Sequence, residues 1–325
     1  MSKHGFLPAA AAVGALLSGV PAGLAQSTEI TAKSRSNPGS QGDAATTYPT
    51  RSSILKVPGG RIYYEVRGSG PLLLMIPGGP TDAGVFADLS RHLVDRYTVV
   101  AYDPRGNSRS TLDGEPEEQR VDVHGDDAAR LIEALGDGPA YVFGSSGGAQ
   151  IGLNLTARYP ERVRALVAHE PPCVMMLPNP SEALAQDEEV HDTYRREGLE
   201  AAVHKFMAMS GLSEEPAKAD APPPVAPTPE AIETLNRING NMEYFIAHGL
   251  MPLSLYVPDV NALRAGHRVV VGLGEKSVGQ ITYRTGAALA EKLGAQPVVF
   301  PGDHIGYGSD ADTFAQILHR ALVDH

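Results

Sequence analysis

The sequence contains no tryptophan and a single cysteine, and only 6% of its 325 residues are aromatic. Because Cys173 has no second cysteine to pair with, no intramolecular disulfide can form, and side-chain packing must stabilise the fold. Basic residues are also few. The 27 Lys and Arg stand against 38 Asp and Glu, which gives a formal net charge of −11. This balance argues against nucleic acids and anionic membranes as partners.

Several functional signatures are missing. No apolar span of about 18 residues occurs beyond the N-terminal segment, so no membrane anchor is expected there. The phosphate-binding Gly-x-x-x-x-Gly-Lys pattern is absent, and residues 144–146 lack the second glycine of a dinucleotide fingerprint. Residues 169–172 read His-Glu-Pro-Pro, and Cys173 stands where a zinc protease motif would need its second histidine. We therefore expect no cofactor and no metal, and a small-molecule substrate as the partner.

The N-terminus is typical of an exported protein. Lys3 precedes an apolar run over residues 6–20, and small residues follow as far as Ala25. This layout predicts a signal peptide over residues 1–25, without a lipoprotein anchor, and a secreted or periplasmic location. A disordered leader on a cytoplasmic protein is the alternative. Residues 26–51 are rich in Ser, Thr, Asn, Gly and Gln and are predicted to be a disordered linker.

Residues 52–171 alternate strand and helix patterns and form the first part of the predicted core. A hairpin comes first, with strands at residues 54–57 and 62–66 around a Pro-Gly-Gly turn. Continuous apolar runs then indicate strands buried on both faces, and amphipathic stretches between them indicate helices. The runs span residues 71–76, 97–102, 140–143 and 163–168, and the helical stretches span residues 83–95, 121–135 and 147–159.

The alternation stops at residues 172–266, which we interpret as an inserted helical lid. Helical stretches at residues 181–212 and 229–247 flank a proline-rich spacer, residues 215–230. Strand and helix patterns resume over residues 267–325, the second part of the core. Together these patterns predict eight strands in a mostly parallel α/β sheet with helices on both faces. The last patterns are strands at residues 269–271 and 297–300 and helices at residues 282–293 and 310–323.

Residues 144–148 read Gly-Ser-Ser-Gly-Gly and lie between a predicted strand and a predicted helix. A Gly-x-Ser-x-Gly turn in that context presents its serine as a nucleophile. The flanking glycines are needed because the turn is too tight for side chains. A serine hydroxyl also needs a base, and the base needs an orienting acid. The alternative is a Gly/Ser turn with no catalytic role, and residues elsewhere in the chain distinguish the two interpretations.

From about residue 52 onward, the chain resembles the α/β-hydrolase family. Residues 76–80 (Ile-Pro-Gly-Gly-Pro) follow the third strand, and residues 102–110 (Tyr-Asp-Pro-Arg-Gly-Asn-Ser-Arg-Ser) follow the fourth. The serine turn follows the fifth strand, and residues 302–304 (Gly-Asp-His) follow the last. All four segments occur in the family's order, each at the carboxyl end of a strand.

The resemblance implies roles for individual residues. Ser146 would be the nucleophile, and His304 would be the general base and then the general acid. The N–H of Gly147 would form one half of the oxyanion hole, and the N–H of Gly79 the other, with Gly78 as the next choice. Loss of one such donor typically slows the reaction by ~10²–10³.

Other polar residues near these segments are interpreted as structural. Asp103 and Arg105 are expected to form an ion pair that braces their loop. His124 and His169 lie near the ends of predicted elements and are expected to serve the fold rather than the chemistry.

The sequence leaves two candidates for the acid. The usual family position follows the seventh strand, where one register places Ser277 and another places Glu275. Glu170 follows the sixth strand directly, an arrangement that resembles haloalkane dehalogenases and zearalenone lactonase. We favour Glu170, with Glu275 as the alternative. A third possibility is that Glu170 only caps the junction with the lid.

A serine at this turn, rather than the aspartate of epoxide hydrolases, points to acyl transfer. We expect hydrolysis of a carboxylic ester or lactone of a small, fairly apolar substrate. A proline-iminopeptidase-like aminopeptidase or amidase is an alternative, although its extended Gly-Gly-Pro-Gly segment and aromatic turn residue are absent. A non-hydrolytic ligand-binding member of the fold is another. The sequence does not determine the oligomeric state. Flexible side chains that could line the pocket are Met175, Met176, Leu177, Met207, Met209 and Met251.

Overall fold

The computed structural model describes residues 49–210, 227–265 and 268–324. The predicted signal peptide, nearly all of the predicted linker and most of the proline-rich spacer lie outside these ranges. Within them, no helix combines the length and hydrophobicity needed to cross a membrane.

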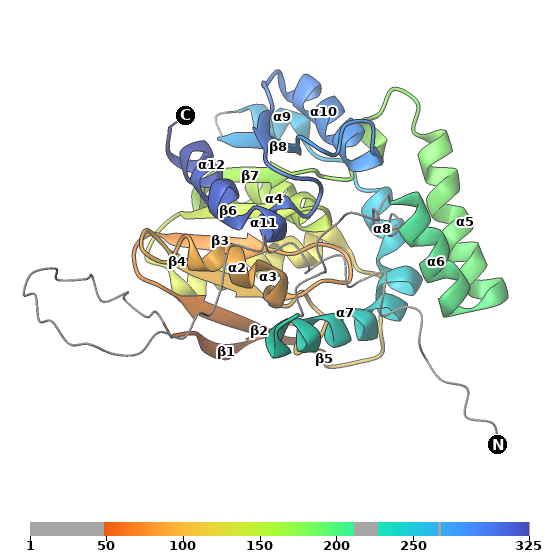
Figure 1. Ribbon diagram of the computed structural model, residues 1–325, viewed down its shortest axis with the longest axis horizontal. Helices are drawn as coiled ribbons and strands as arrows, with labels where there is room; N and C mark the ends of the chain where they lie inside the picture. Colours follow the sequence, from red (N-terminus) through yellow and green to blue (C-terminus); the bar gives the residue numbers. More distant parts are fainter. Residues whose placement is uncertain (1–48, 211–226, 266–267, 325) are drawn as a thin grey trace, which may run out of the picture.

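A nine-stranded sheet forms the centre of the described chain, in the order β1-β2-β4-β3-β6-β7-β8-β9, with β5 paired to β2 (Figure 1). Neighbours from β4 to β9 run parallel, whereas β1, β2 and β5 pair antiparallel. The predicted fold class is confirmed. The short strand β5 is the addition that the sequence patterns did not show. The strands are β1 (Arg51–Val57), β2 (Gly60–Arg67), β3 (Leu72–Ile76), β4 (Thr98–Tyr102), β5 (Thr111–Leu112), β6 (Ala140–Ser145), β7 (Val163–His169), β8 (Val269–Gly274) and β9 (Val298–Phe300).

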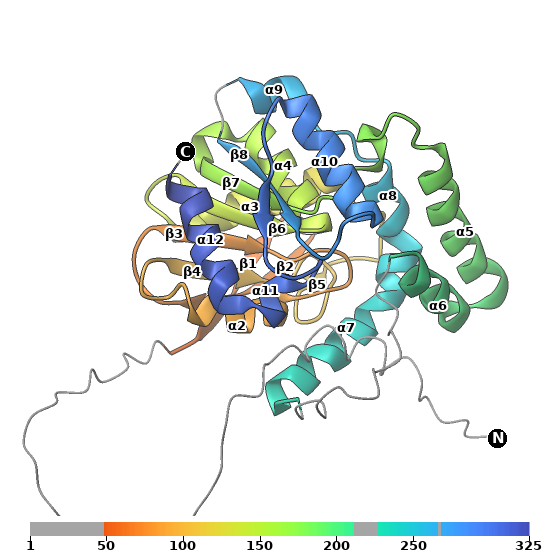
Figure 2. The same cartoon turned by 45° about the horizontal axis from the view of Figure 1, so that its top comes forward.

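Two layers of helices cover the sheet, one on each face (Figure 2). The alternation of side chains along β3 shows why both faces are apolar. Leu72, Leu74 and Ile76 belong to one core cluster, and Leu73 and Met75 belong to the other. One layer contains α3 (Val121–Leu135), α4 (Gly147–Arg158), α9 (Val260–Arg264) and α10 (Ile281–Leu293). The other contains η1 (Ala83–Phe86), α2 (Ala87–Arg91), α11 (Gly306–Ser309) and α12 (Ala311–Val323).

The segment between β7 and β8 is mainly helical and extends to one side of the sheet (Figure 1). Gly198 divides the first predicted helical stretch, because its φ of 94° breaks the helix. Helices α5, α6, α7 and α8 share a small apolar core of their own, whereas Leu263 of α9 packs into the main core. The remaining elements are η2 (Pro160–Arg162), η3 (Val174–Met176), α5 (Ser181–Glu197), α6 (Leu199–Met209), α7 (Pro229–His248) and α8 (Leu250–Ser254).

The order of the strands determines where a ligand can bind. Strand β3 lies between β4 and β6, so the connections on its two sides lead in opposite directions across the sheet. At such a switch point, the loops at the carboxyl ends of the strands separate and leave a crevice. The loops after β3 and β6 carry Gly79 and Ser146, respectively.

Candidate functional site

Ser146 lies in a strained turn between β6 and α4, with φ 57° and ψ −129°. A residue other than glycine rarely adopts this conformation, and such strain is typical of functional sites. The glycines on either side are required for steric reasons. A Cβ on Gly144 would collide with the carbonyl oxygen of Gly148, and one on Gly148 would collide with that of Ile76. The turn therefore packs against the end of β3 and exposes the serine at the carboxyl edge of the sheet.

His304 follows β9 and contacts Glu170, which follows β7. Nδ1 of His304 lies 2.7 Å from Oε2 of the carboxylate. Glu170 is fully buried, and its φ of 45° turns its side chain back toward the sheet edge. The N–H of Gly274 donates to Oε1 at 2.9 Å, and the Thr282 hydroxyl donates to Oε2 at 3.0 Å. The carboxylate thus has three hydrogen-bond partners that fix its orientation toward His304.

The surroundings of Glu170 also determine its charge. Burial by itself would raise the pKa of its carboxyl group, but the hydrogen bond and charge of His304, with help from Gly274, lower the pKa to about 2. The group is therefore an anion at neutral pH. A fixed anion at Nδ1 holds a proton on that nitrogen, and the other ring nitrogen, Nε2, is left to act as a base.

Glu275, the other candidate acid, does not take this position. Its side chain is exposed at the end of β8 and accepts only a long hydrogen bond, 3.4 Å, from the N–H of Gly302. Ser277, at the other register considered, is buried, and its hydroxyl has no partner among the described residues. The structure therefore brings Glu170 to His304, and not Glu275 or Ser277.

Two backbone N–H groups lie close together beside Ser146. The backbone nitrogen of Gly79 lies 3.2 Å from the position that a Cβ on Gly147 would occupy. Neither the Gly79 N–H nor the Gly147 N–H donates a hydrogen bond within the described parts of the chain. Gly78 instead packs against the turn, since a Cβ there would lie 2.6 Å from the nitrogen of Gly147. Two unused donors of this kind can bind a developing oxyanion.

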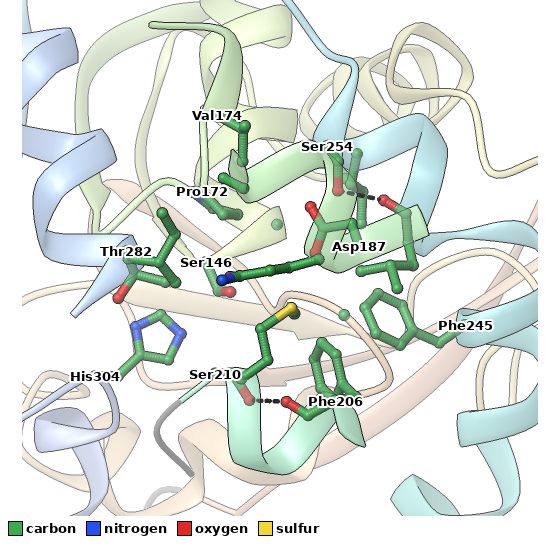
Figure 3. A pocket seen from close by; sticks show the side chains of 18 residues that line it. Ser146, Pro172, Val174, Asp187, Phe206, Ser210, Phe245, Ser254, Thr282 and His304 are labelled. Atoms are coloured by element: carbon green, nitrogen blue, oxygen red, sulfur yellow. Dashed lines mark hydrogen bonds between the residues drawn. The ribbon is translucent and has the colours of Figure 1, made fainter. Parts of the chain in front are cut away.

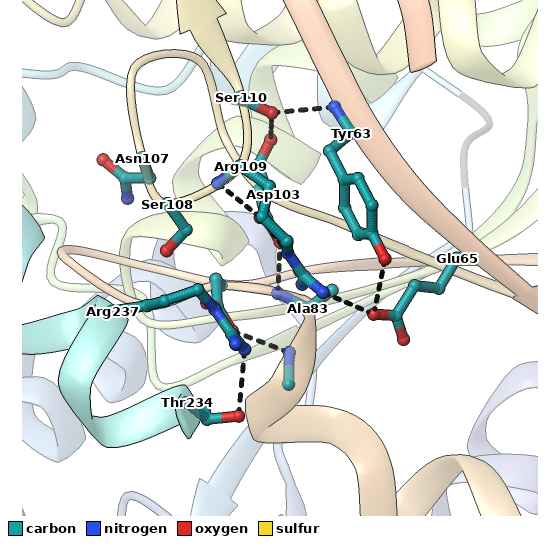
Figure 4. Close-up of polar contacts among 12 residues, drawn as sticks. Tyr63, Glu65, Ala83, Asp103, Asn107, Ser108, Arg109, Ser110, Thr234 and Arg237 are labelled. Carbon is teal, nitrogen blue, oxygen red and sulfur yellow. Dashed lines mark hydrogen bonds and ion pairs between the residues drawn. The ribbon is translucent and has the colours of Figure 1, made fainter. Parts of the chain in front are cut away.

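Polar contacts hold the loop that carries Gly79 at two places, and Figure 4 shows the contact between Asp103 and Ala83. The amide of Asn107 donates to the carbonyl groups of Gly79 and Thr81, at 3.1 and 3.2 Å. The fully buried Asp103 accepts from the N–H of Ala83 at 3.0 Å, at the far end of the same loop. These contacts limit how far the Gly79 N–H can move.

The predicted ion pair between Asp103 and Arg105 is wrong. Asp103 pairs with Arg109, whose Nε lies 2.8 Å from Oδ2. Arg105 instead forms two hydrogen bonds of 2.9 Å with Asp127 of α3. The reason is the path of the backbone. The chain turns after Asp103 and directs Arg105 toward α3, and it returns to Asp103 only at Arg109.

The two histidines expected to be structural are both buried. Burial lowers the pKa of His124 to about 4 and that of His169 to about 3, so both rings are neutral at pH 7. His169 lies between Ser145, whose hydroxyl is 3.2 Å from its Nδ1, and the His304 ring, with which it stacks at 6.3 Å. Its ring therefore packs against His304, the candidate base.

Ser146, His304, Gly79 and Gly147 all line one pocket of about 110 Å³ (Figure 3). Ser146, His304 and Gly79 also line a second chamber of about 90 Å³, which extends toward Tyr307 and Ile238. Of the flexible side chains expected here, Met209 lines the first chamber and Met207 the second. The rest of the first chamber is largely apolar and comes from Pro172, Val174, Ala183, Phe206, Phe245, Leu250, Leu253 and Ile281.

The sequence analysis did not identify five polar residues of this pocket, which are Gln186, Asp187, Ser210, Ser254 and Thr282. Thr282 begins the turn of α10 that reaches Glu170, and Asp187 enters from α5. Asp187 shows no local motif, and its only sequence signal is an acid among the apolar positions of an amphipathic helix. No group of three or more His, Cys, Asp or Glu residues is arranged to hold a metal ion within residues 49–210, 227–265 and 268–324.

Comparisons with known proteins agree with this fold. The model of the alpha/beta hydrolase fold family matches residues 71–210. The chain is 37% identical over 276 residues to the uncharacterized hydrolase YraK of Bacillus subtilis (strain 168), a match that covers 83% of this chain and 96% of that protein. The chain therefore belongs to the α/β-hydrolase superfamily, and it is a hydrolase of that fold.

More distant relatives have been assigned substrates. Zearalenone hydrolase of Bionectria ochroleuca is 26% identical over 284 residues, which cover 85% of this chain and 99% of that protein. Among solved structures, a thermophilic esterase from Thermogutta terrifontis has a TM-score of 0.64 at 20% identity and covers 86% of this chain and 99% of its own. The structural match shows the shared fold.

Proposed function

We propose that this protein is a serine hydrolase that cleaves a carboxylic ester or lactone of a small, fairly apolar substrate through an acyl-serine intermediate. The observation that carries the proposal is the 2.7 Å contact between His304 and the ionised Glu170, with His304 and Ser146 in one pocket. The relative named zearalenone hydrolase supports it.

In the proposed reaction, Ser146 Oγ attacks the substrate carbonyl and passes its proton to Nε2 of His304. Glu170 stabilises the resulting imidazolium through Nδ1–H. The N–H groups of Gly79 and Gly147 donate to the oxyanion of the tetrahedral intermediate. His304 then gives its proton to the leaving alcohol oxygen, which departs and leaves an acyl-serine. Water, deprotonated by His304, attacks the acyl-serine by the same route and releases the acid.

The two chambers suit a substrate with a part on each side of the scissile bond. Both are lined by Ser146, His304 and Gly79, and their volumes are similar, about 110 and 90 Å³. One chamber would hold the acyl part and the other the leaving alcohol. In a lactone the two parts remain joined, and the same chambers would hold the two arms of the ring.

The proposal is tested with p-nitrophenyl acetate and a fluorophosphonate probe. The wild-type protein should release p-nitrophenol and be labelled at Ser146. Ser146→Ala should remain folded by circular dichroism, lose the label, and lose activity by ~10³ or more. Wild-type protein that neither turns over the ester nor reacts with the probe would remove the hydrolase mechanism proposed for this site.

A further inference from the structure

The pocket contains one charged group that the proposed reaction does not use. Asp187 lies on α5, its residue surface is 6% exposed, and it lines the same chamber as Ser146 and His304. Figure 3 shows it beside Ser254, on the side of the pocket away from His304. The chamber lining is mostly apolar and includes Phe245, and it also contains the polar side chains of Gln186, Ser210 and Ser254.

Asp187 forms no ion pair with any Lys, Arg or His of the described chain. Burial raises the pKa of its carboxyl group to about 6, and the nearby Ser254 hydroxyl opposes that shift. The same hydroxyl donates to the carbonyl of Leu250 at 2.8 Å, so it satisfies Asp187 poorly. Among the described residues, His304 is the only other titratable side chain that lines the chamber. At neutral pH the carboxylate is mostly ionised and keeps unused acceptor sites.

The other buried acids show how unusual this is. A buried carboxylate without a partner destabilises a fold, and proteins normally pair it. Every other buried Asp or Glu of the described residues has an Arg or His partner. These pairs are Glu65 with Arg67 and Arg109, Asp82 with Arg237, Asp103 with Arg109, Asp127 with Arg105, and Glu170 with His304. Asp187 is the exception, and it is the one that faces the pocket away from the reacting groups.

We propose that Asp187 determines specificity by accepting a hydrogen bond from an amino or hydroxyl group on the part of the substrate that enters this chamber. The inference deepens the proposed function, on which it rests for the reaction at Ser146. The substrate would then have a short apolar body with a reactive carbonyl at one end and a hydrogen-bond donor at the other. A cavity of about 110 Å³ has room for only a few non-hydrogen atoms beyond the carbonyl.

A donor group on the substrate would give the Asp187 carboxylate a hydrogen-bond partner. An ammonium group would also neutralise the buried charge. A substrate without a donor would leave the carboxylate desolvated and unpaired. Discrimination against such an analogue is typically strong, because a hydrogen bond to a charged group is lost. We expect a preference of about 10–100-fold for the donor-bearing compound.

Binding measurements test this without any need for turnover. Nuclear magnetic resonance titrations would compare 1-butylamine and 1-butanol with methyl propyl ether, which has the same number of non-hydrogen atoms and no donor. The proteins are wild type, Asp187→Leu, Asp187→Asn and the control Glu188→Gln. Glu188 is the adjacent exposed acid on α5 and lies outside the chamber lining, so its change alters the charge but not the pocket.

Wild type and Glu188→Gln should bind the amine or the alcohol at least about tenfold more tightly than the ether. Asp187→Leu should abolish the difference. Asp187→Asn keeps the shape and one acceptor oxygen, so it should lose the preference for the amine while it keeps part of that for the alcohol. A preference for the amine alone identifies a cationic substrate, and a preference for both identifies any donor.

Two results would overturn the inference: equal binding of all three compounds by wild type, or an unchanged preference in both Asp187 variants. Asp187→Asn covers the case in which Asp187→Leu does not fold. Failure here is distinct from failure of the proposed function. If p-nitrophenyl acetate is not hydrolysed but the preference depends on Asp187, only the reaction mechanism is wrong. If the ester is hydrolysed and no variant alters the preference, only the specificity role is wrong.

Discussion

Glu170 is both a fully buried carboxylate and a residue with positive φ, 45°. Ser146 shares the second feature, with φ 57°. Residues other than glycine adopt a positive φ at a cost of about 1–3 kcal/mol, and this conformation persists where the surrounding structure holds it. Here the strain brings both residues to the carboxyl edge of the sheet beside His304. The most strained positions of the site are thus the ones proposed to do its chemistry.

Substitution of each carboxylate separately distinguishes Glu170 from Glu275 as the acid. Glu170→Gln removes the charge opposite Nδ1 of His304, and we expect kcat to fall by ~10⁴. Glu275→Gln changes an exposed side chain with no contact to His304, and kcat should change by less than about twofold. The rates are measured with p-nitrophenyl acetate on variants that circular dichroism shows to be folded. The opposite ranking would transfer the role of the acid to Glu275.

Helix α7 connects the helical insertion to the loop that carries Gly79. Arg237 reaches the fully buried Asp82, with Nε 2.5 Å from Oδ2. One turn further along, the Asn241 amide donates to the carbonyl of Pro80 at 2.7 Å and to the Ser108 hydroxyl at 2.8 Å. Pro80 directly follows Gly79, so α7 covers the pocket and also holds the backbone that would bind the oxyanion.

Two substitutions in α7, one of a buried ion pair and one of an exposed ion pair, test this connection. Arg237→Ala leaves the buried Asp82 carboxylate without its ion pair, and the free energy of unfolding should fall by about 1–3 kcal/mol. The Gly79 loop should also loosen, so kcat should fall. Glu230 of the same helix pairs with Arg91 of α2 at 3.7 Å and is 81% exposed. Glu230→Ala should therefore leave both quantities nearly unchanged, since exposed pairs contribute little.

Urea denaturation and p-nitrophenyl acetate kinetics measure the two effects. Equal losses of unfolding free energy and kcat in the Arg237 and Glu230 variants would contradict the larger contribution expected of the buried ion pair.

Across the whole molecule, buried titratable groups make the fold sensitive to acid. His124 and His169 have pKa values of about 4 and about 3 in the folded state, well below the ordinary 6.5. Between those values and 6.5 the unfolded chain binds more protons than the folded one. Stability therefore falls as the pH falls through this window. Glu170, with its pKa of about 2 against 4.5, adds a further loss at lower pH, whereas Asp187, raised from 3.8 to about 6, acts in the opposite direction.

The prediction is a protein that loses stability steadily below about pH 6.5. His124→Gln removes one of the protons taken up on unfolding. The slope of unfolding free energy against pH, measured by urea denaturation between pH 4.5 and 6, should become shallower by about 1 kcal/mol per pH unit. His204→Gln, on α6 and exposed, serves as the control and should leave the slope unchanged. A His124 variant with the wild-type slope would contradict the assignment of acid sensitivity to this buried ring.

Features that depend on neighbours along the chain could be predicted from the sequence. The alternation of apolar runs and amphipathic stretches predicted the main strands and helices, because each element's periodicity is local. The Gly-x-Ser-x-Gly turn pointed to Ser146 for the same reason, since its glycines prevent collisions within one tight connection. The position of His304 after the last strand, together with the resemblance to a known family, pointed to the base.

Which distant groups meet could be seen only in the folded protein. Glu170 and Glu275 both follow strands that end at the same edge, and only the path of the backbone after β7 and β8 brings the first to His304 and exposes the second. Arg109 rather than Arg105 reaches Asp103 for the same kind of reason. The sequence also could not show that Asp187 has no Lys, Arg or His partner among the described residues, because pairing depends on everything packed around a side chain. The physical reason is common to all three: periodicity and turn chemistry act between neighbours, whereas charge pairing and desolvation depend on distances that arise only after the chain has folded.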